Sequence, residues 1–79
     1  MRVAITIPQM GASIDRARIL RWTKSVGEQV ADLDPLVEVE TSKAVFEIEA
    51  EQAGRLVEIL HSSGTFPIQT VIGYLETDG

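Results

Sequence analysis

One short segment of the chain holds a lysine in a setting that suits covalent chemistry. Lys43 lies in the run Thr41-Ser42-Lys43-Ala44, and a segment of alternating apolar and acidic residues stands on each side of this run. An accessible, deprotonated lysine amine is a nucleophile toward carbonyl groups. Most lysines, however, are only solvated surface residues. The flanking segments therefore decide whether Lys43 has a special position.

These flanking segments are typical of two strands of an antiparallel hairpin. Apolar residues alternate with glutamates, at Val37 and Val39 before the lysine and at Phe46 and Ile48 after it. Opposite residues of paired strands share a face, so all four point inward only if the connecting loop has an even number of residues. A two-residue loop pairs Val39 with Phe46, and a four-residue loop gives the same register. Both alternatives predict that Lys43 lies at the tip of the hairpin.

The predicted turn departs from the usual chemistry of tight hairpins. Primed turns need positive φ and so favour Asn-Gly, Asp-Gly or another glycine pair, whereas Thr-Ser-Lys-Ala contains none of these residues. Such departures are expected where a residue is kept for function rather than for folding. The turn therefore strengthens the case for a functional lysine.

Composition limits the other functions that the chain could have. Its 79 residues suit one small domain, and because it has no cysteine, thiol redox chemistry must be imported. A net charge of −5 disfavours nucleic acid and anionic membranes as partners. No apolar run approaches the roughly 20 residues that cross a membrane, and no signal peptide is recognisable. We expect a soluble chain in the cytoplasm.

The hydrophobic periodicity of the whole chain is two rather than 3.6. Short alternating or apolar runs occur at 3–7, 37–40, 45–50 and 56–60, and glycine, proline and aspartate separate them. No stretch sustains the pattern of an amphipathic helix. The sequence therefore predicts a small antiparallel sandwich or barrel.

The two halves of the chain resemble each other. Residue types recur 37 positions apart in the middle of the chain and 36 positions apart further on. These aligned pairs include Arg18 with Arg55, Gly27 with Gly64 and Leu36 with Ile72. Nearer the start of the chain Ile5 matches Phe46 and Ile7 matches Ile48, at a different offset that a longer first loop, about residues 9–16, absorbs. A duplicated half-domain predicts a pseudo-twofold axis. It also predicts that the segment 40–45, which joins the halves, and the chain ends lie at opposite ends of the molecule.

Taken together, these features resemble the lipoyl domain of 2-oxo acid dehydrogenase complexes. The resemblance rests on Glu-Thr-Ser-Lys-Ala at 40–44, on Ile-Pro-Gln-Met-Gly at 7–11 and on Trp22, an aromatic residue that we expect in the core. It covers nearly the whole chain. It implies a flattened all-β barrel of two four-stranded antiparallel sheets, the barrel-sandwich hybrid. The carrier domain would span residues 1–76, with 77–79 as a tail or the start of a linker.

The resemblance implies that Lys43 carries lipoic acid in amide linkage, within a turn formed by Glu40, Thr41, Ser42 and Ala44. The isolated domain would be a monomeric carrier without catalytic residues. It would shuttle acyl groups and electrons from a thiamine-diphosphate-dependent decarboxylase component to an acyltransferase core and a dihydrolipoyl dehydrogenase. A lipoate ligase or octanoyltransferase would modify it.

Two groups of residues are candidates for partner recognition. Gly11, Ala12 and Ser13 lie in the longest expected loop, and the corresponding loop of lipoyl domains lies close to the lysine and helps the decarboxylase to discriminate its carrier. Glu38 and Glu47 are expected to face each other on the solvent side of the hairpin. They would form an acidic patch for a basic enzyme surface, or simply a solvated polar face.

Other functions stay open at this point. Biotin carrier domains resemble lipoyl domains and modify a lysine of the same hairpin, but they usually have methionine on both sides of it, where this chain has Ser42 and Ala44. An unmodified β-sandwich interaction module is a further alternative. His61, the single histidine, has no companion at metal-ligand spacing, so we expect no metal site.

Overall fold

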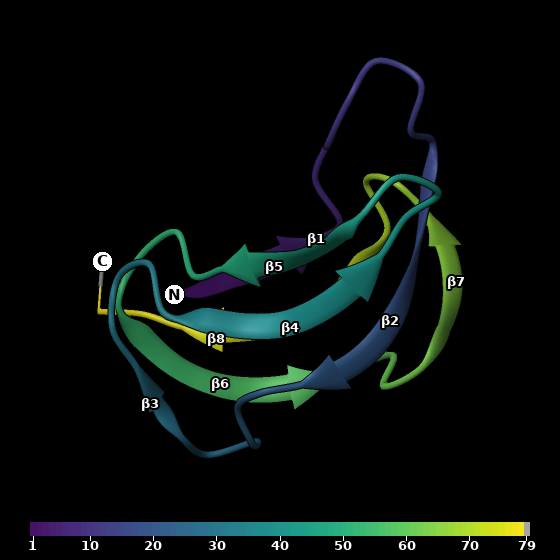
Figure 1. Ribbon diagram of the computed structural model, residues 1–79. Helices are drawn as coiled ribbons and strands as arrows, with labels where there is room; N and C mark the ends of the chain where they lie inside the picture. The colour runs from purple at the N-terminus through teal and green to yellow at the C-terminus, as the bar shows by residue number, and fades with distance from the viewer. Residues whose placement is uncertain (79) are drawn as a thin grey trace.

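The computed structural model describes residues 1–78, which form strands joined by turns and loops (Figure 1). These residues contain no helix, and so none long and apolar enough to span a membrane. The strands are β1 (Arg2–Thr6), β2 (Arg16–Trp22), β3 (Gln29–Val30), β4 (Pro35–Glu40), β5 (Val45–Glu49), β6 (Gly54–Ile59), β7 (Gly64–Pro67) and β8 (Val71–Glu76). The predicted all-β class is confirmed.

The strands form two four-stranded antiparallel sheets, in the orders β1-β8-β6-β3 and β5-β4-β2-β7. Exchanging the two halves of the chain converts one order into the other, since β1 then replaces β5 and β8 replaces β4. Each sheet takes two strands from each half, so neither half can separate without breaking both sheets. The extents of 35 × 21 × 17 Å describe a flattened body. The predicted barrel-sandwich with pseudo-twofold symmetry is confirmed.

Irregular backbone positions recur at the predicted offsets. The second strand of each half has a bulge, at Leu20 in β2 and at Val57 in β6, 37 positions apart. The described residues with positive φ are Gly27 (97°), Leu33 (70°), Gly64 (104°) and Gln69 (74°). A positive φ is uncommon and costly outside glycine. Its recurrence at Leu33 and Gln69, 36 positions apart, therefore indicates one local structure used twice.

The first strands of the two halves align differently from our expectation. Ile5 lies opposite Gly73 in β8, and Ile48 lies opposite Val37 in β4. Because Val37 and Gly73 are 36 positions apart, Ile5 corresponds to Ile48, and the predicted match of Ile5 with Phe46 is wrong by two residues. A shift of two residues keeps every side chain on the same face of a strand. The apolar pattern alone could not distinguish the two alignments.

The chain ends occupy the place that the β4–β5 turn has in the other half. The backbone N–H of Thr77 donates to the carbonyl oxygen of Met1 at 2.8 Å, and its hydroxyl donates to the same oxygen at 3.3 Å. Thr41 makes the same two bonds to the carbonyl oxygen of Ala44, at 2.9 and 3.1 Å. Figure 1 shows the hairpin and the termini at opposite ends of the molecule, as predicted.

The core between the sheets is mainly aliphatic. Its buried members are Ile5, Ile7, Ala17, Ile19, Val30, Leu36, Val37, Val39, Ile48, Ala50, Leu56, Ile72 and Leu75. Trp22 is partly buried and packs against this cluster, in agreement with the core position expected for it. Thr77 is only 6% exposed and bonds to the carbonyl oxygen of Met1. The boundary after residue 76 stays a prediction, and Gly79 lies outside the described residues.

Gly54 provides a test of the close approach between β6 and β8. A Cβ atom at this position would lie 2.5 Å from the carbonyl oxygen of Glu76. Where space allows, replacing glycine by alanine stabilises a protein by about 0.4–1 kcal/mol. For Gly54→Ala we expect the opposite sign, a loss of about 1–3 kcal/mol in urea unfolding, because the backbone must move.

The matched control is Ala17→Gly, at the equivalent position of the first half. This change removes a methyl group instead of adding one, and we expect it to cost about 1 kcal/mol through backbone entropy. A gain of stability in Gly54→Ala would show that β6 and β8 are not in close contact there.

Candidate functional site

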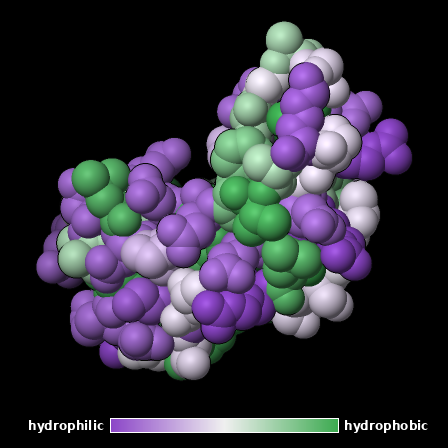
Figure 2. Space-filling model, viewed as in Figure 1, coloured by the Kyte–Doolittle hydropathy of each residue, from purple (hydrophilic) through white to green (hydrophobic). Residues whose placement is uncertain are grey.

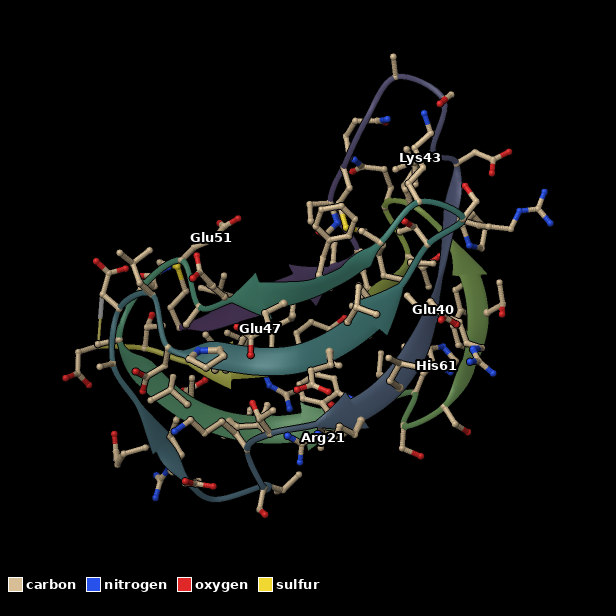
Figure 3. All side chains as sticks on the ribbon, in the orientation of Figure 1. Arg21, Glu40, Lys43, Glu47, Glu51 and His61 are labelled. Atoms are coloured by element: carbon tan, nitrogen blue, oxygen red, sulfur yellow. The ribbon has the colours of Figure 1, made fainter. Side chains whose placement is uncertain are left out.

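The hairpin between β4 and β5 places Lys43 in its turn. Val39 lies opposite Phe46 and Val37 opposite Ile48, which is the register predicted from the sequence. The backbone N–H of Thr41 donates to the carbonyl oxygen of Ala44 at 2.9 Å and so closes a turn with Ser42 and Lys43 at its centre. Figure 3 shows Lys43 projecting from the end of this hairpin.

The Thr41 side chain explains how the turn forms without glycine. Its hydroxyl oxygen accepts the backbone N–H groups of Lys43 and Ala44, both at 3.2 Å, and the hydroxyl donates to the carbonyl oxygen of Ala44. None of the four turn residues, 41–44, is among the described residues with positive φ. Threonine hydroxyls can cap local N–H groups in this way. The unusual turn sequence is therefore satisfied by a side chain rather than by a special backbone conformation.

The chain has two lysines, and their surroundings differ. The Nζ atom of Lys24 lies 3.8 Å from a carboxylate oxygen of Glu28 and 3.7 Å from one of Asp34. Lys43 is exposed, and within residues 1–78 no carboxylate lies within ion-pair distance of its Nζ atom. The nearby Glu40 instead pairs with Arg18 at 2.8 Å. Lys43 thus has the accessible amine.

The outer face of the β4–β5 hairpin is less acidic than its own residues suggest. Glu38 lies opposite Glu47, as predicted. Arg21 in β2 donates two hydrogen bonds to the Glu38 carboxylate, at 3.1 and 3.2 Å. The hydrogen bond and the negative charge of Glu38 raise the pKa of Arg21, and Glu47 adds to the effect. The cationic Arg21 therefore offsets the charge of Glu38, while Glu47 has no ion-pair partner within residues 1–78.

Two arginines of β2, which the sequence did not single out, change the charge of the surface around the hairpin. Arg18 and Arg21 pair with Glu40 and Glu38 across the strand boundary. The charged residues of β2 can be read from the sequence. Their partners cannot, because the sequence does not show that β2 lies beside β4. Hydrophilic side chains predominate on the visible face around β4 and β5, with a few apolar ones between them (Figure 2).

The long loop before β2 rises at the same end of the molecule as the turn between β4 and β5 (Figure 1). It leads into β2, where Arg18 lies opposite Glu40 at the base of the hairpin turn. The amide nitrogen of Gln9 donates to the carbonyl oxygens of Gly11 and Ile14, and so closes the loop. The buried Ile14 lies beneath the loop, and Ala12 and Ser13 are exposed at its tip. Of the expected recognition residues, Ala12 and Ser13 are therefore exposed, and Gly11 is half-buried.

His61 has a structural setting. Its ring lies 4.2 Å from that of Phe66, centroid to centroid, and its carbonyl oxygen accepts the indole N–H of Trp22 at 2.8 Å. Among the described residues, no group of three histidine or acidic side chains could hold a metal ion.

Known proteins resemble this chain along most of its length. Residues 3–70 match the family described as Biotin-requiring enzyme. The dihydrolipoyllysine-residue succinyltransferase component of the 2-oxoglutarate dehydrogenase complex of Bartonella vinsonii subsp. berkhoffii is 38% identical over 77 residues, 96% of this chain and 19% of that protein. The pyruvate dehydrogenase E1 component subunit beta of Rhizobium meliloti is 32% identical over 81 residues, 100% of this chain and 18% of that protein.

A solved structure agrees with these matches. The lipoyl domain of the 2-oxoglutarate dehydrogenase complex from Azotobacter vinelandii superposes with a TM-score of 0.72 at 32% identity, over 96% of this chain and 100% of that one. The chain spans about a fifth of the length of the curated relatives named above. Lipoyl domains are non-catalytic carriers that bind lipoic acid covalently on a lysine, so the predicted preference for lipoic acid over biotin is confirmed. The chain therefore belongs to the Biotin-requiring enzyme family, as a lipoyl carrier domain.

Proposed function

We propose that Lys43 carries lipoic acid, in amide linkage to Nζ. The observation that supports this assignment is the contrast between the two lysines, since Lys43 projects from the turn while Lys24 lies between two carboxylates. The lysine side chain and its lipoyl group together form a long flexible arm. If this arm started on the face of a sheet, it would lie along the protein. An arm that starts at a hairpin turn can point in many directions, which suits a carrier that visits several enzymes.

Attachment needs only the amine of Lys43 and an activated acyl group, presented by a lipoate ligase or an octanoyltransferase. The deprotonated Nζ attacks the acyl carbon, and the C–N bond forms as the bond to the leaving group breaks. The leaving group keeps that electron pair, the extra proton on nitrogen goes to solvent, and no oxidation or reduction occurs. Glu40, Thr41, Ser42 and Ala44 form the surrounding turn that the enzyme would meet.

We infer that the domain works within a larger 2-oxo acid dehydrogenase complex, because its relatives are named as components of such complexes. When bound, lipoic acid supplies a disulfide that accepts an acyl group together with two electrons. The domain would collect both from a thiamine-diphosphate-dependent decarboxylase component. It would then visit an acyltransferase core and a dihydrolipoyl dehydrogenase. The chain itself contributes the exposed turn to which the lipoyl group is attached.

We also propose the boundaries, the oligomeric state and the cellular location of the domain. We infer a monomeric carrier domain over residues 1–76, with 77–79 as a tail or the start of a linker. A cytoplasmic location is consistent with the bacterial relatives. The termini lie at the end opposite the hairpin, so a linker would leave Lys43 unobstructed (Figure 1).

We propose that the decarboxylase component recognises the end of the molecule that carries Lys43. The exposed loop residues Ala12 and Ser13, with Gly11 beside them, would contact it first. Glu47 offers a carboxylate without an ion-pair partner within residues 1–78, whereas Glu38 is already bonded to Arg21. Glu47 is therefore the stronger of the two acidic candidates.

Intact mass after co-expression with a lipoate ligase tests the attachment site. We expect the wild-type domain to gain the mass of one lipoyl group, and Lys43→Arg to gain none while staying folded, because an exposed turn side chain supports little packing. Lys24→Arg is the matched control and should be modified completely. Modification of Lys43→Arg, or a mass increase that matches biotin, would refute the assignment.

Rates of reductive acylation by a thiamine-diphosphate-dependent decarboxylase test the recognition proposal. We expect Glu47→Gln to raise KM for the lipoylated domain about two- to fivefold at low salt, the value of one exposed ion pair. The effect should shrink at high salt because screening weakens it. Glu38→Gln should have a smaller effect, since Arg21 already neutralises that carboxylate. An equal or larger effect of Glu38→Gln would contradict the proposal.

A further inference from the structure

The two threonines that close the ends of the barrel provide an internal comparison. Thr41 and Thr77 are 36 positions apart and equivalent by the pseudo-twofold axis. Each donates its backbone N–H and its hydroxyl to one carbonyl oxygen, that of Ala44 for Thr41 and that of Met1 for Thr77. These two bonds belong to the closure of the barrel, because they occur where there is no lysine turn.

Two further hydrogen bonds occur only at the hairpin. The hydroxyl oxygen of Thr41 also accepts the backbone N–H groups of Lys43 and Ala44. Thr77 has no counterpart of these bonds among the described residues. Their effect is local, since they fix the peptide groups on both sides of the Lys43 Cα atom. They therefore set the direction in which the lysine side chain leaves the turn.

This control of direction is needed because of the turn sequence. Tight hairpin turns are usually fixed by glycine or asparagine at positive φ, and Thr-Ser-Lys-Ala has neither residue. Without the Thr41 hydroxyl, the N–H groups of Lys43 and Ala44 would bond to water, and the turn would sample several conformations. Only a fraction of the molecules would then have the conformation that a modifying enzyme binds. The apparent affinity of the enzyme for the domain falls in proportion to this fraction.

We propose that Thr41 is a positioning residue for the modification of Lys43. Its hydroxyl holds the turn in the one conformation that the attachment enzyme recognises, while the chemistry occurs at the lysine amine. The proposal rests on the assignment of Lys43 as the attachment site. It adds a role that exposure of the lysine alone does not supply.

The test compares kcat/KM for modification by a lipoate ligase among three variants of the domain, at a temperature where circular dichroism shows all of them folded. Thr41→Val keeps the shape of the side chain but removes the hydroxyl, and we expect a loss of about three- to tenfold, the range of one to two net hydrogen bonds. Thr41→Ser keeps the hydroxyl and should stay within about twofold of wild type. Thr77→Val removes the equivalent hydroxyl away from the lysine and should leave kcat/KM unchanged, even if it lowers Tm.

Two further measurements separate positioning from general damage. Acylation of Lys43 by acetic anhydride, followed by mass spectrometry, should proceed equally fast in wild type and Thr41→Val, because the amine itself is unaltered. Amide exchange at Lys43 and Ala44, followed by NMR, should be faster in Thr41→Val than in Thr77→Val.

The proposal is wrong if Thr41→Val is modified at the wild-type rate, if Thr41→Ser is as slow as Thr41→Val, or if Thr77→Val is equally slow. Each of these outcomes would still leave Lys43 as the attachment site. A wild-type domain that gains no lipoyl mass on Lys43 would instead refute the assignment of the site itself. The two failures are therefore distinguishable in one set of samples.

Discussion

The pairing register between β4 and β5 is the constraint on which the site depends. Val37 and Val39 are completely buried, and their partners Ile48 and Phe46 face the same core. A slip by one residue would turn every side chain of one strand to the opposite face, and so bury glutamates and expose the apolar residues. Burying unpaired carboxylates costs far more than an unfavourable turn. The turn must therefore adapt to the register, and the position of Lys43 follows from it.

The duplicated architecture explains why the two ends of the molecule serve different purposes. The same threonine closure occurs at both ends, with a continuous turn at one and the two termini at the other. Thr41 and Thr77 thus make equivalent bonds at the two ends, whereas the Lys43 side chain takes no part in this closure. A chain that continues beyond the described residues would leave from the end opposite the lysine (Figure 1). The linker and the arm then occupy separate regions along the 35 Å long axis.

The fold and the position of Lys43 could be predicted from the sequence. Apolar and polar residues alternate along the strands, and the loop must have an even number of residues, so few registers of the hairpin are possible. The same period hid an error of two residues in the alignment of Ile5, since a shift by two preserves every face. The charge pairing could not be predicted, because Arg21 meets Glu38 only when β2 lies beside β4. The role of Thr41 was equally hidden. Its hydroxyl matters through bonds to backbone groups, which no spacing of residue types reveals.

The central claim is that the geometry of the turn, and not exposure alone, selects the modified lysine. The most direct measurement is the intact mass of the double variant Ser42→Lys with Lys43→Ser after co-expression with a lipoate ligase. This exchange keeps composition, charge and an exposed lysine while moving the amine by one residue. We expect a domain that stays folded by circular dichroism and gains little or no lipoyl mass. Complete modification at position 42 would contradict it.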